Sequence, residues 1–224
     1  MKQGDDLHQL LQGKRLLIFD FDGTVADTSP LHAAAFAQVL APLGIAVDYP
    51  AIAGLKTLDA MRKCMTGARW SIQDDEMHEM VTAKQLLVRQ MIAKNLAPLP
   101  GVDEFLRWAR PRYRLSMATS GSRGTVQLAL EKLGYLGWFD PLICADDVCH
   151  AKPHPEGFLS VLQITGIQAS DALVFEDSAA GLAAAAAARL DYCDVRTGSW
   201  TRLTDANPCN GQSERSMNRT AISE

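Results

Sequence analysis

The stretch Leu16-Leu17-Ile18-Phe19-Asp20-Phe21-Asp22-Gly23-Thr24 decides how the chain of 224 residues is interpreted. Its four leading apolar residues predict a short strand that is buried on both faces. Side chains at i and i+2 of an extended backbone point the same way, so Asp20 and Asp22 are expected to project together from the carboxyl end of that strand. Gly23 permits a sharp turn immediately afterwards. Because open α/β sheets bind ligands at this end, the two carboxylates are candidate functional groups.

A calcium loop is the alternative interpretation of this D-x-D-G pattern. An EF-hand loop that began at Asp20 would need oxygen ligands at positions 24 and 26 and a glutamate at position 31. The chain has Thr24, Ala26 and Leu31 at these places. The sequence therefore favours a strand with two carboxylates over a calcium loop.

Composition and charge limit the classes of function. Hydrophobic residues make up 47% and charged residues 21% of the chain, which is ordinary for a globular protein. The net charge of −4 comes without a basic cluster, so no nucleic-acid partner is expected. No apolar run reaches the roughly 18 residues of a membrane span, and residues 1–6 lack a signal-peptide pattern. We therefore expect a cytoplasmic protein without a membrane partner, and we take a monomer as the working oligomeric state.

The cysteines give no disulfide pattern. They are odd in number and scattered, without a C-x-x-C pair: Cys64, Cys144, Cys149, Cys193 and Cys209. We expect reduced thiols, and none of them lies in a motif typical of a catalytic cysteine.

Beyond Thr24 the chain divides into a helical part and an alternating part. Helical spacing predicts helices at 31–40, 57–66 and 73–95. From residue 98 onward, predicted strands (113–119, 141–144, 172–175 and an edge strand at 190–195) alternate with predicted helices at 102–110, 122–133, 155–165 and 179–188. This alternation implies a parallel sheet with right-handed crossovers. The predicted fold class is α/β: a Rossmann-like core of residues 14–27 and 98–196, a helical insert at 28–97, and a polar, disordered tail at 197–224.

Polar residues follow three further predicted strands. Thr119 and Ser120 stand just before a helix, where free N–H groups attract phosphate. Lys152 lies between prolines and alanine in A-K-P-H-P, and Glu176 and Asp177 come directly after a buried strand. Each signal alone has an ordinary structural explanation, such as a helix cap or a solvated lysine.

Together these residues favour phosphoryl chemistry. Four carboxylates would form an all-oxygen cluster of the kind that holds Mg²⁺: Asp20, Asp22, Glu176 and Asp177. A lysine and hydroxyl groups beside such a cluster suit a phosphoryl group.

In this order the motifs resemble those of the haloacid dehalogenase superfamily of phosphohydrolases: Asp20-Phe21-Asp22-Gly23-Thr24, Thr119, Lys152-Pro153 and Glu176-Asp177. The resemblance covers residues 14–196. Within the superfamily the chain is similar to the β-phosphoglucomutase-like subgroup, and the segment 190–196 is most similar to short bacterial fructose-1-phosphate or related sugar-phosphate phosphatases. The resemblance implies a Rossmann-like core with a small helical cap inserted after the first strand.

The resemblance also implies roles for the acidic residues. Asp20 is implied to attack phosphorus and form an aspartyl-phosphate. Asp22 is implied to protonate the leaving alcohol and then to activate water, which argues against dehalogenase chemistry, because that reaction needs no acid for an alcohol. The implied ligands of the Mg²⁺ cofactor are Asp20, Asp22 through its backbone carbonyl, Asp177 and, in support, Glu176.

The implied substrate contacts come from both parts of the chain. Thr119 and Lys152 are expected to bind the phosphoryl oxygens, with Ser120 beside them. The helical insert resembles the cap that closes over the active site in this family. His32 and Lys84 match cap-side positions that face the site, the alternatives being a packed histidine and a solvated lysine.

Two departures from the family pattern qualify the prediction. Mutases of the subgroup carry an arginine where this chain has Thr57, so hydrolysis is favoured, although Lys56 could replace the arginine in part. The family usually has Ala-Gly-Met where the chain has Ala188-Arg189-Leu190, and arginine accepts a left-handed conformation poorly. The predicted function is a Mg²⁺-dependent phosphatase of small phosphate monoesters, especially sugar phosphates. The alternatives are a hexose-phosphate mutase and a non-catalytic metabolite-binding protein.

Overall fold

The computed structural model describes residues 7–70 and 73–196, and its centre is a sheet of five strands in the order β3-β2-β1-β4-β5. All neighbouring strands run parallel, which confirms the predicted fold class. The strands are β1 Leu16–Phe19, β2 Arg114–Ala118, β3 Leu142–Ile143, β4 Ala172–Glu176 and β5 Asp191–Asp194. β1 and β4 are fully buried, β2 is buried after its first residue, and β5 is half-buried or exposed.

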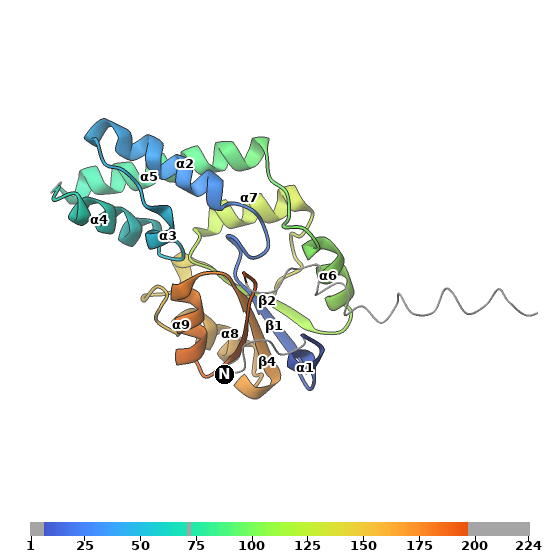
Figure 1. Ribbon diagram of the computed structural model, residues 1–224. Helices are drawn as coiled ribbons and strands as arrows, with labels where there is room; N and C mark the ends of the chain where they lie inside the picture. Colours follow the sequence, from blue (N-terminus) through green and yellow to red (C-terminus); the bar gives the residue numbers. More distant parts are fainter. Residues whose placement is uncertain (1–6, 71–72, 197–224) are drawn as a thin grey trace, which may run out of the picture.

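Helices cover both faces of the sheet (Figure 1). Side chains alternate along β1, so Leu17 and Phe19 pack towards α6 and α7, whereas Leu16 and Ile18 pack towards α8 and α9. A short helix, α1, precedes β1. The helices of this part of the chain are α1 Leu7–Leu11, α6 Val102–Ala109, α7 Arg123–Leu133, α8 Glu156–Thr165 and α9 Ala179–Ala187, with short 3₁₀ helices at Ala145–Asp147 and Ala169–Asp171.

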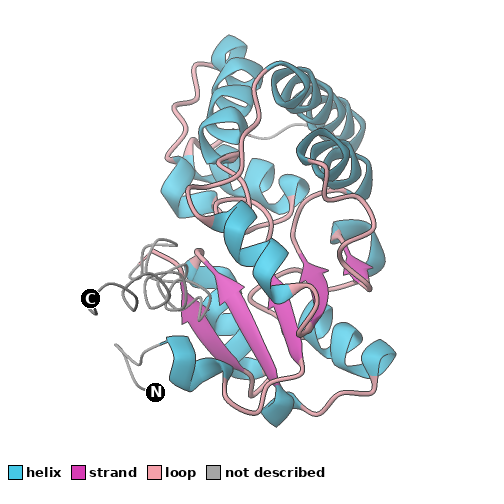
Figure 2. Cartoon of the chain, turned by 90° about the vertical axis from the view of Figure 1, so that its right-hand side faces the viewer, coloured by secondary structure: helices cyan, strands magenta, loops and turns pink. Residues whose placement is uncertain are grey.

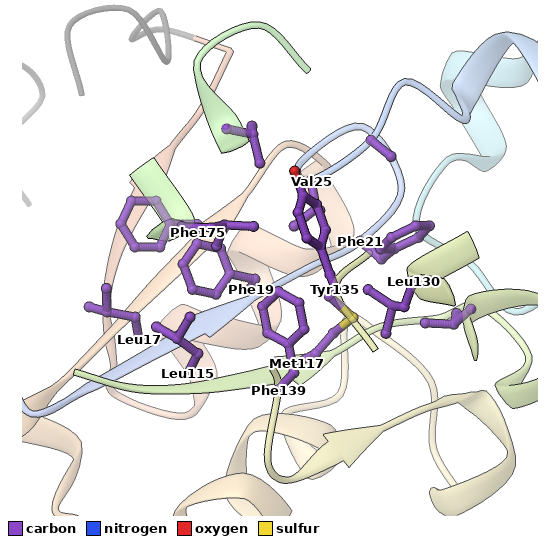
Figure 3. Packing of buried hydrophobic residues seen from close by; sticks show 14 of the residues in the cluster. Leu17, Phe19, Phe21, Val25, Leu115, Met117, Leu130, Tyr135, Phe139 and Phe175 are labelled. Carbon is purple, nitrogen blue, oxygen red and sulfur yellow. The ribbon is translucent and has the colours of Figure 1, made fainter. Parts of the chain in front are cut away.

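A cluster of aromatic side chains fixes the register at the carboxyl ends of the central strands (Figure 3). Phe19 on β1 is paired with Met117 on β2 and with Phe175 on β4. The rings of Phe19 and Phe175 are stacked with centroids 4.8 Å apart, and Phe139 meets Phe19 edge-on at 5.8 Å. Because these residues are adjacent in register, the residues that follow β1, β2 and β4 all begin at the same edge of the sheet.

The helical insert lies beyond the carboxyl ends of the strands (Figure 2). It has a separate apolar cluster, which includes Phe36, Leu40 and Met61. An isolated bridge between Ala26 and Pro98 joins its entry to its exit. Its helices are α2 Ser29–Leu40, a 3₁₀ turn at Ala41–Leu43, α3 Tyr49–Ile52, α4 Thr57–Gly67 and α5 Asp74–Lys94.

The predicted elements and the observed ones agree in type and differ at their ends by one or two residues. The short helix α3 has no counterpart in the prediction, since four residues give too little periodicity to detect. Arg189 adopts a left-handed conformation with φ of 57°. Glycine is usual at this position in the family that the chain resembles, and arginine accepts this conformation poorly. The predicted tail and residues 1–6 lie outside the described residues, and no helix within the described ranges is long and apolar enough to cross a membrane.

Four of the cysteines lie in the described part of the chain, and all four are free thiols, in agreement with the expectation of reduced thiols. Burial raises the pKa of the Cys144 thiol to about 12 and that of Cys193 to about 11. These thiols are therefore protonated and poorly nucleophilic at neutral pH. Cys209 lies outside the described residues.

Candidate active site

Groups from several strand ends meet at the edge of the sheet that faces the insert. Asp20 follows β1, Thr119 follows β2 and Glu176 is the last residue of β4. The backbone N–H of Asp20 donates to the carbonyl of Phe175, 3.0 Å away, so the parallel ladder continues one step beyond the strand. Lys152 reaches the same place from the loop between β3 and α8. Lys152 and Asp20, which are 132 positions apart in sequence, are thereby brought into contact.

Lys152 joins two buried carboxylates. Its ammonium nitrogen donates to Asp20 Oδ1 and to Glu176 Oε2, each at 2.6 Å. Burial alone would lower the pKa of Lys152, but the two carboxylates outweigh burial and raise the pKa above its usual value. The side chain is thus a fixed positive charge beside Asp20.

The other oxygen of Glu176 fixes the turn into α9. Glu176 Oε1 accepts from the backbone N–H groups of Asp177 and Ser178 and from the Ser178 hydroxyl. Ser178 in turn caps α9 by accepting from the N–H of Gly181 at 3.0 Å. A β-carbon at Gly181 would overlap the Glu176 carboxylate. Glycine is therefore required here because the carboxylate occupies the space of a side chain.

Three carboxylates converge on one point and could hold a metal ion: Asp20, Glu176 and Asp177, whose ligand oxygens lie within 4.8 Å of one another. Thr24 donates to Asp177 Oδ1 at 3.1 Å, and the absence of a side chain at Gly23 leaves room for the Asp177 carboxylate. Burial and then the charge of Glu176 raise the pKa of Asp20 well above its usual value, and the same causes raise that of Asp177 to about 6. Lys152 alone therefore does not compensate the cluster, and an all-oxygen set of this kind fits Mg²⁺.

Asp22 is separated from this group by its own partners. Its Oδ1 accepts from the Thr28 hydroxyl at 2.6 Å and lies 3.4 Å from His32 Nε2. His32 Nδ1 is 2.8 Å from the ammonium nitrogen of Lys84. Burial acts to raise the pKa of Asp22, but His32, Thr28 and Lys84 outweigh it and lower the pKa to about 2. Asp22 is thus ionised, and its carboxylate is directed towards the insert.

The two insert residues predicted to face the site do so. Lys84 is 1% exposed and His32 is 9% exposed, and both line the cavity beside Asp20 and Asp22. Burial lowers the pKa of Lys84 to about 8. His32 Nε2 is buried; among the described residues it lies 3.4 Å from Asp22 Oδ1 but completes no hydrogen bond. An oxygen of a ligand in this cavity could therefore complete its hydrogen bonding.

The hydroxyl groups of Thr119 and Ser120, which follow β2, have different hydrogen-bond partners. Thr119 Oγ1 accepts from the N–H of Gly121 at 3.1 Å, one turn before α7. Ser120 instead donates to the carbonyl of Gly54 in the insert at 2.6 Å. Ser120 thus fastens the insert to the core in this structure, and its contact with phosphate stays a prediction.

A second hydrogen bond, which the sequence did not reveal, joins the insert to the loop between β3 and α8. Lys56 Nζ donates to the carbonyl of Val148 at 2.6 Å, while Thr57 lines the cavity between the insert and the core. The expectation that Lys56 partly replaces an arginine is therefore not supported by this geometry. Gly54 has a φ of +80°, and Ser178 occupies the place where a side chain would be. Glycine at this position therefore allows the insert to approach the core closely.

The cavity enclosed by the insert and the strand ends has a volume of about 40 Å³. Its walls carry acidic groups from the core, with His32 and Lys84 from the insert, and aromatic and aliphatic groups such as Tyr49 and Ile52. Pockets that bury a drug-sized ligand measure about 300–1,000 Å³. The structure thus represents a closed arrangement that would have to open before a sugar phosphate could enter.

Comparison with known proteins gives a consistent result. Residues 17–195 match the family model described as haloacid dehalogenase-like hydrolase. A fructose-1-phosphate phosphatase of Escherichia coli is 35% identical over 180 residues, which are 80% of this chain and 95% of that protein. The solved structure of CbbY from Rhodobacter sphaeroides in complex with phosphate is 25% identical with a TM-score of 0.72, over 80% of this chain and 84% of that chain.

A further solved structure, a β-phosphoglucomutase from Clostridium difficile, shows the shared fold alone. It is 22% identical with a TM-score of 0.74, over 80% of this chain and 83% of that one. The resemblance drawn from the four motifs is confirmed by these matches.

Proposed function

The chain belongs to the haloacid dehalogenase-like hydrolases, and from that premise we propose that it hydrolyses sugar phosphates through an aspartyl-phosphate on Asp20, with Mg²⁺ as cofactor. As an enzyme it is a phosphoric monoester hydrolase. One observation carries the proposal: Asp20 lines the cavity, is held at Oδ1 by Lys152 and is grouped with Glu176 and Asp177.

Asp20 is the proposed nucleophile. Lys152 holds one of its oxygens, so the other oxygen is the one proposed to attack phosphorus as the alcohol leaves. Lys152 and Thr119 then contact the non-bridging oxygens of the phosphoryl group, where negative charge gathers in the transition state. Glu176 keeps Lys152 in place from behind, through the 2.6 Å contact at its Oε2.

Asp20 and Asp177, with the backbone carbonyl of Asp22, would hold the metal, and Glu176 would support them. When bound, Mg²⁺ supplies positive charge that lets a carboxylate approach a phosphate dianion. The raised pKa values of Asp20 and Asp177 favour this assignment, because they indicate repulsion that a cation would remove.

Asp22 is the proposed acid and base. It is ionised in the closed structure, with a pKa of about 2. A phosphate dianion beside it would raise that pKa by like-charge repulsion, so the proton needed by the leaving alcohol would be taken up as the substrate binds. Asp22 would then return to the carboxylate form by giving this proton to the alcohol, and would accept a proton from the water that hydrolyses the aspartyl-phosphate.

The insert is the proposed cap, and the division of the chain into residues 14–27 with 98–196 and residues 28–97 rests on this role. Hydrogen bonds from Ser120 to Gly54, from Lys56 to Val148 and from Arg89 to Thr125 are among the contacts that hold it on the core. His32 Nε2, which lies 3.4 Å from Asp22 Oδ1, and the Lys84 ammonium would meet the sugar hydroxyls or the phosphate beneath the closed cap. The cap thus decides which phosphate monoesters reach Asp20.

A mutase is the second candidate, and one observation weighs against it. A mutase must bind a second phosphate, whereas Thr57 lines the cavity where the subgroup's arginine is expected and Lys56 is directed to Val148. Hydrolysis to inorganic phosphate is therefore the favoured outcome.

A panel of sugar phosphates that includes fructose 1-phosphate and β-glucose 1-phosphate, each incubated with purified protein and Mg²⁺, tests the proposal. Release of inorganic phosphate, absent in Asp20→Asn, is the expected result. Conversion of β-glucose 1-phosphate to glucose 6-phosphate in the presence of a trace of the bisphosphate would indicate a mutase. Neither product from any substrate would favour a binding-only protein and would overturn the proposal.

A further inference from the structure

A second group of metal-ligating side chains lies outside the acidic cluster. His150, His154 and Glu156 offer ligand atoms that lie within 4.8 Å of one another, and theirs is one of two such groups within residues 7–70 and 73–196. His150 Nδ1 is 2.8 Å and His154 Nδ1 is 3.9 Å from the same oxygen, Oε2 of Glu156. The two imidazole rings face each other with centroids 4.6 Å apart.

Glu156 is fixed in position by the backbone of the loop that precedes it. Its Oε1 accepts from the N–H of Cys149 at 2.7 Å and its Oε2 accepts from the N–H of His150 at 2.8 Å. These two bonds fix the orientation of the Glu156 carboxylate. A carboxylate oriented by backbone N–H groups resembles the supported ligands of metal sites.

The ligand set differs in chemistry from the acidic cluster. Two imidazoles with one carboxylate suit zinc and neighbouring transition metals, whereas Mg²⁺ prefers oxygen ligands alone. His150 and His154 are half exposed or more, so an ion could enter from solvent without opening the cap. A metal at this place would replace the 2.8 Å contact between His150 Nδ1 and Glu156 Oε2.

We propose that His150, His154 and Glu156 bind a divalent transition metal of the zinc type, at a site separate from the Mg²⁺ cluster. The two histidines stand two positions before and two positions after Lys152. A metal held by both would bridge the loop that carries this lysine into the active site. Binding would therefore restrict the loop, and it would do so whatever substrate the enzyme uses.

Calorimetric titration with Zn²⁺ in saturating Mg²⁺ tests the proposal, since Mg²⁺ keeps the acidic cluster occupied. Wild-type protein should bind one equivalent at this site. The double variant His150→Ala with His154→Ala should lose at least roughly tenfold in affinity, because removing groups that only support a ligand already costs about 10–100-fold. Wild-type affinity and stoichiometry in the double variant would overturn the proposal.

Two further variants locate the ion. His78→Ala removes an exposed histidine of α5 and should leave Zn²⁺ binding unchanged. Asp177→Asn alters the acidic cluster and should also keep the Zn²⁺ equivalent; its loss there would show that the ion occupies the Mg²⁺ cluster and would overturn the proposal. If the double variant proves unstable by circular dichroism, His154→Gln alone decides the question by the same tenfold criterion.

Discussion

Replacing Lys152 by methionine tests the charge balance at the centre of the site. The ammonium nitrogen lies 2.6 Å from a carboxylate oxygen of Asp20 and 2.6 Å from one of Glu176, and none of the three residues is more than 9% exposed. Methionine keeps much of the side-chain volume but leaves two buried carboxylates together without a cation. Breaking a buried ion pair in this way costs about 3–5 kcal/mol. The free energy of unfolding in the absence of Mg²⁺ should fall by that amount.

A second change, Glu176→Gln, separates charge from packing. In the variant that carries both changes, Asp20 is the only ionisable residue left of Asp20, Lys152 and Glu176, so the repulsion between these two buried carboxylates is removed. Because an unsatisfied buried group costs about 1–3 kcal/mol, this double variant should be more stable than Lys152→Met alone by a similar amount. A loss of the same size in both variants would mean that the lysine stem, rather than its charge, matters.

The pH dependence of the loss has a defined sign. In Lys152→Met an unpaired buried carboxyl group has a folded-state pKa above its unfolded value, so the folded protein binds the extra proton. Stability should therefore be higher at low pH and be lost as the pH rises through that pKa. The difference between wild type and Lys152→Met should be smaller at about pH 5.5 than at about pH 8.

Urea unfolding followed by tryptophan fluorescence measures these differences, with far-UV circular dichroism to check that each variant folds. If Lys152→Met lowers the free energy of unfolding at the higher pH by no more than about 1 kcal/mol, the contribution of an exposed surface ion pair, the reasoning is refuted. A double variant less stable than Lys152→Met would refute it equally.

Three further changes test the geometry around the site. Arg189→Gly should raise the free energy of unfolding by about 1 kcal/mol, because arginine here holds a φ of 57° that glycine adopts without strain; a lower Tm would contradict this. Gly181→Ala should lower stability by about 1–3 kcal/mol and reduce activity, because the added carbon overlaps the Glu176 carboxylate. Gly67→Ala in α4, where the added carbon meets nothing within 4 Å, is the matched control that should keep activity and should not lower stability, because alanine favours a helix over glycine. Saturating Mg²⁺ should raise the Tm of the wild type, and Asp177→Asn should lose most of that rise; equal rises in both would show that the cation binds elsewhere.

The strands and their polar ends were predictable because local sequence specifies them. Leu16–Phe19 is an apolar run that stops at a carboxylate, and the run before Glu176 has the same form. Parallel strands align their carboxyl ends, so the meeting of Asp20, Thr119 and Glu176 at one edge of the sheet follows from the strand pattern alone.

The contacts between the insert and the core were not predictable in this way. The position of Ser120 before a helix predicts a helix cap or a ligand of phosphate. Its hydroxyl instead donates to the carbonyl of Gly54, 66 positions away. Lys56 is expected from the sequence to replace in part the arginine that holds a second phosphate in mutases. Its ammonium group instead donates to the carbonyl of Val148. Such contacts depend on how two packed bodies meet, and neither periodicity nor residue type carries that information.

Arg189 illustrates a conflict that sequence could detect but not resolve. The residue type disfavours the left-handed conformation, and the backbone adopts it nonetheless. The N–H groups of Arg189 and Leu190 close the end of α9 on the carbonyls of Ala186 and Ala185, and Leu190 is buried. Helix closure and burial of the following leucine therefore outweigh the local strain of about 1–2 kcal/mol.

Covalent labelling of Asp20 tests the central claim most directly. Wild-type protein is mixed with a sugar phosphate that it hydrolyses, labelled with ³²P, and is quenched in acid within milliseconds. The account predicts protein-bound label that hydroxylamine removes, as expected for an acyl phosphate, and no label on Asp20→Asn. Stable label on Asp20→Asn, or phosphate release from that variant at the wild-type rate, would contradict the account.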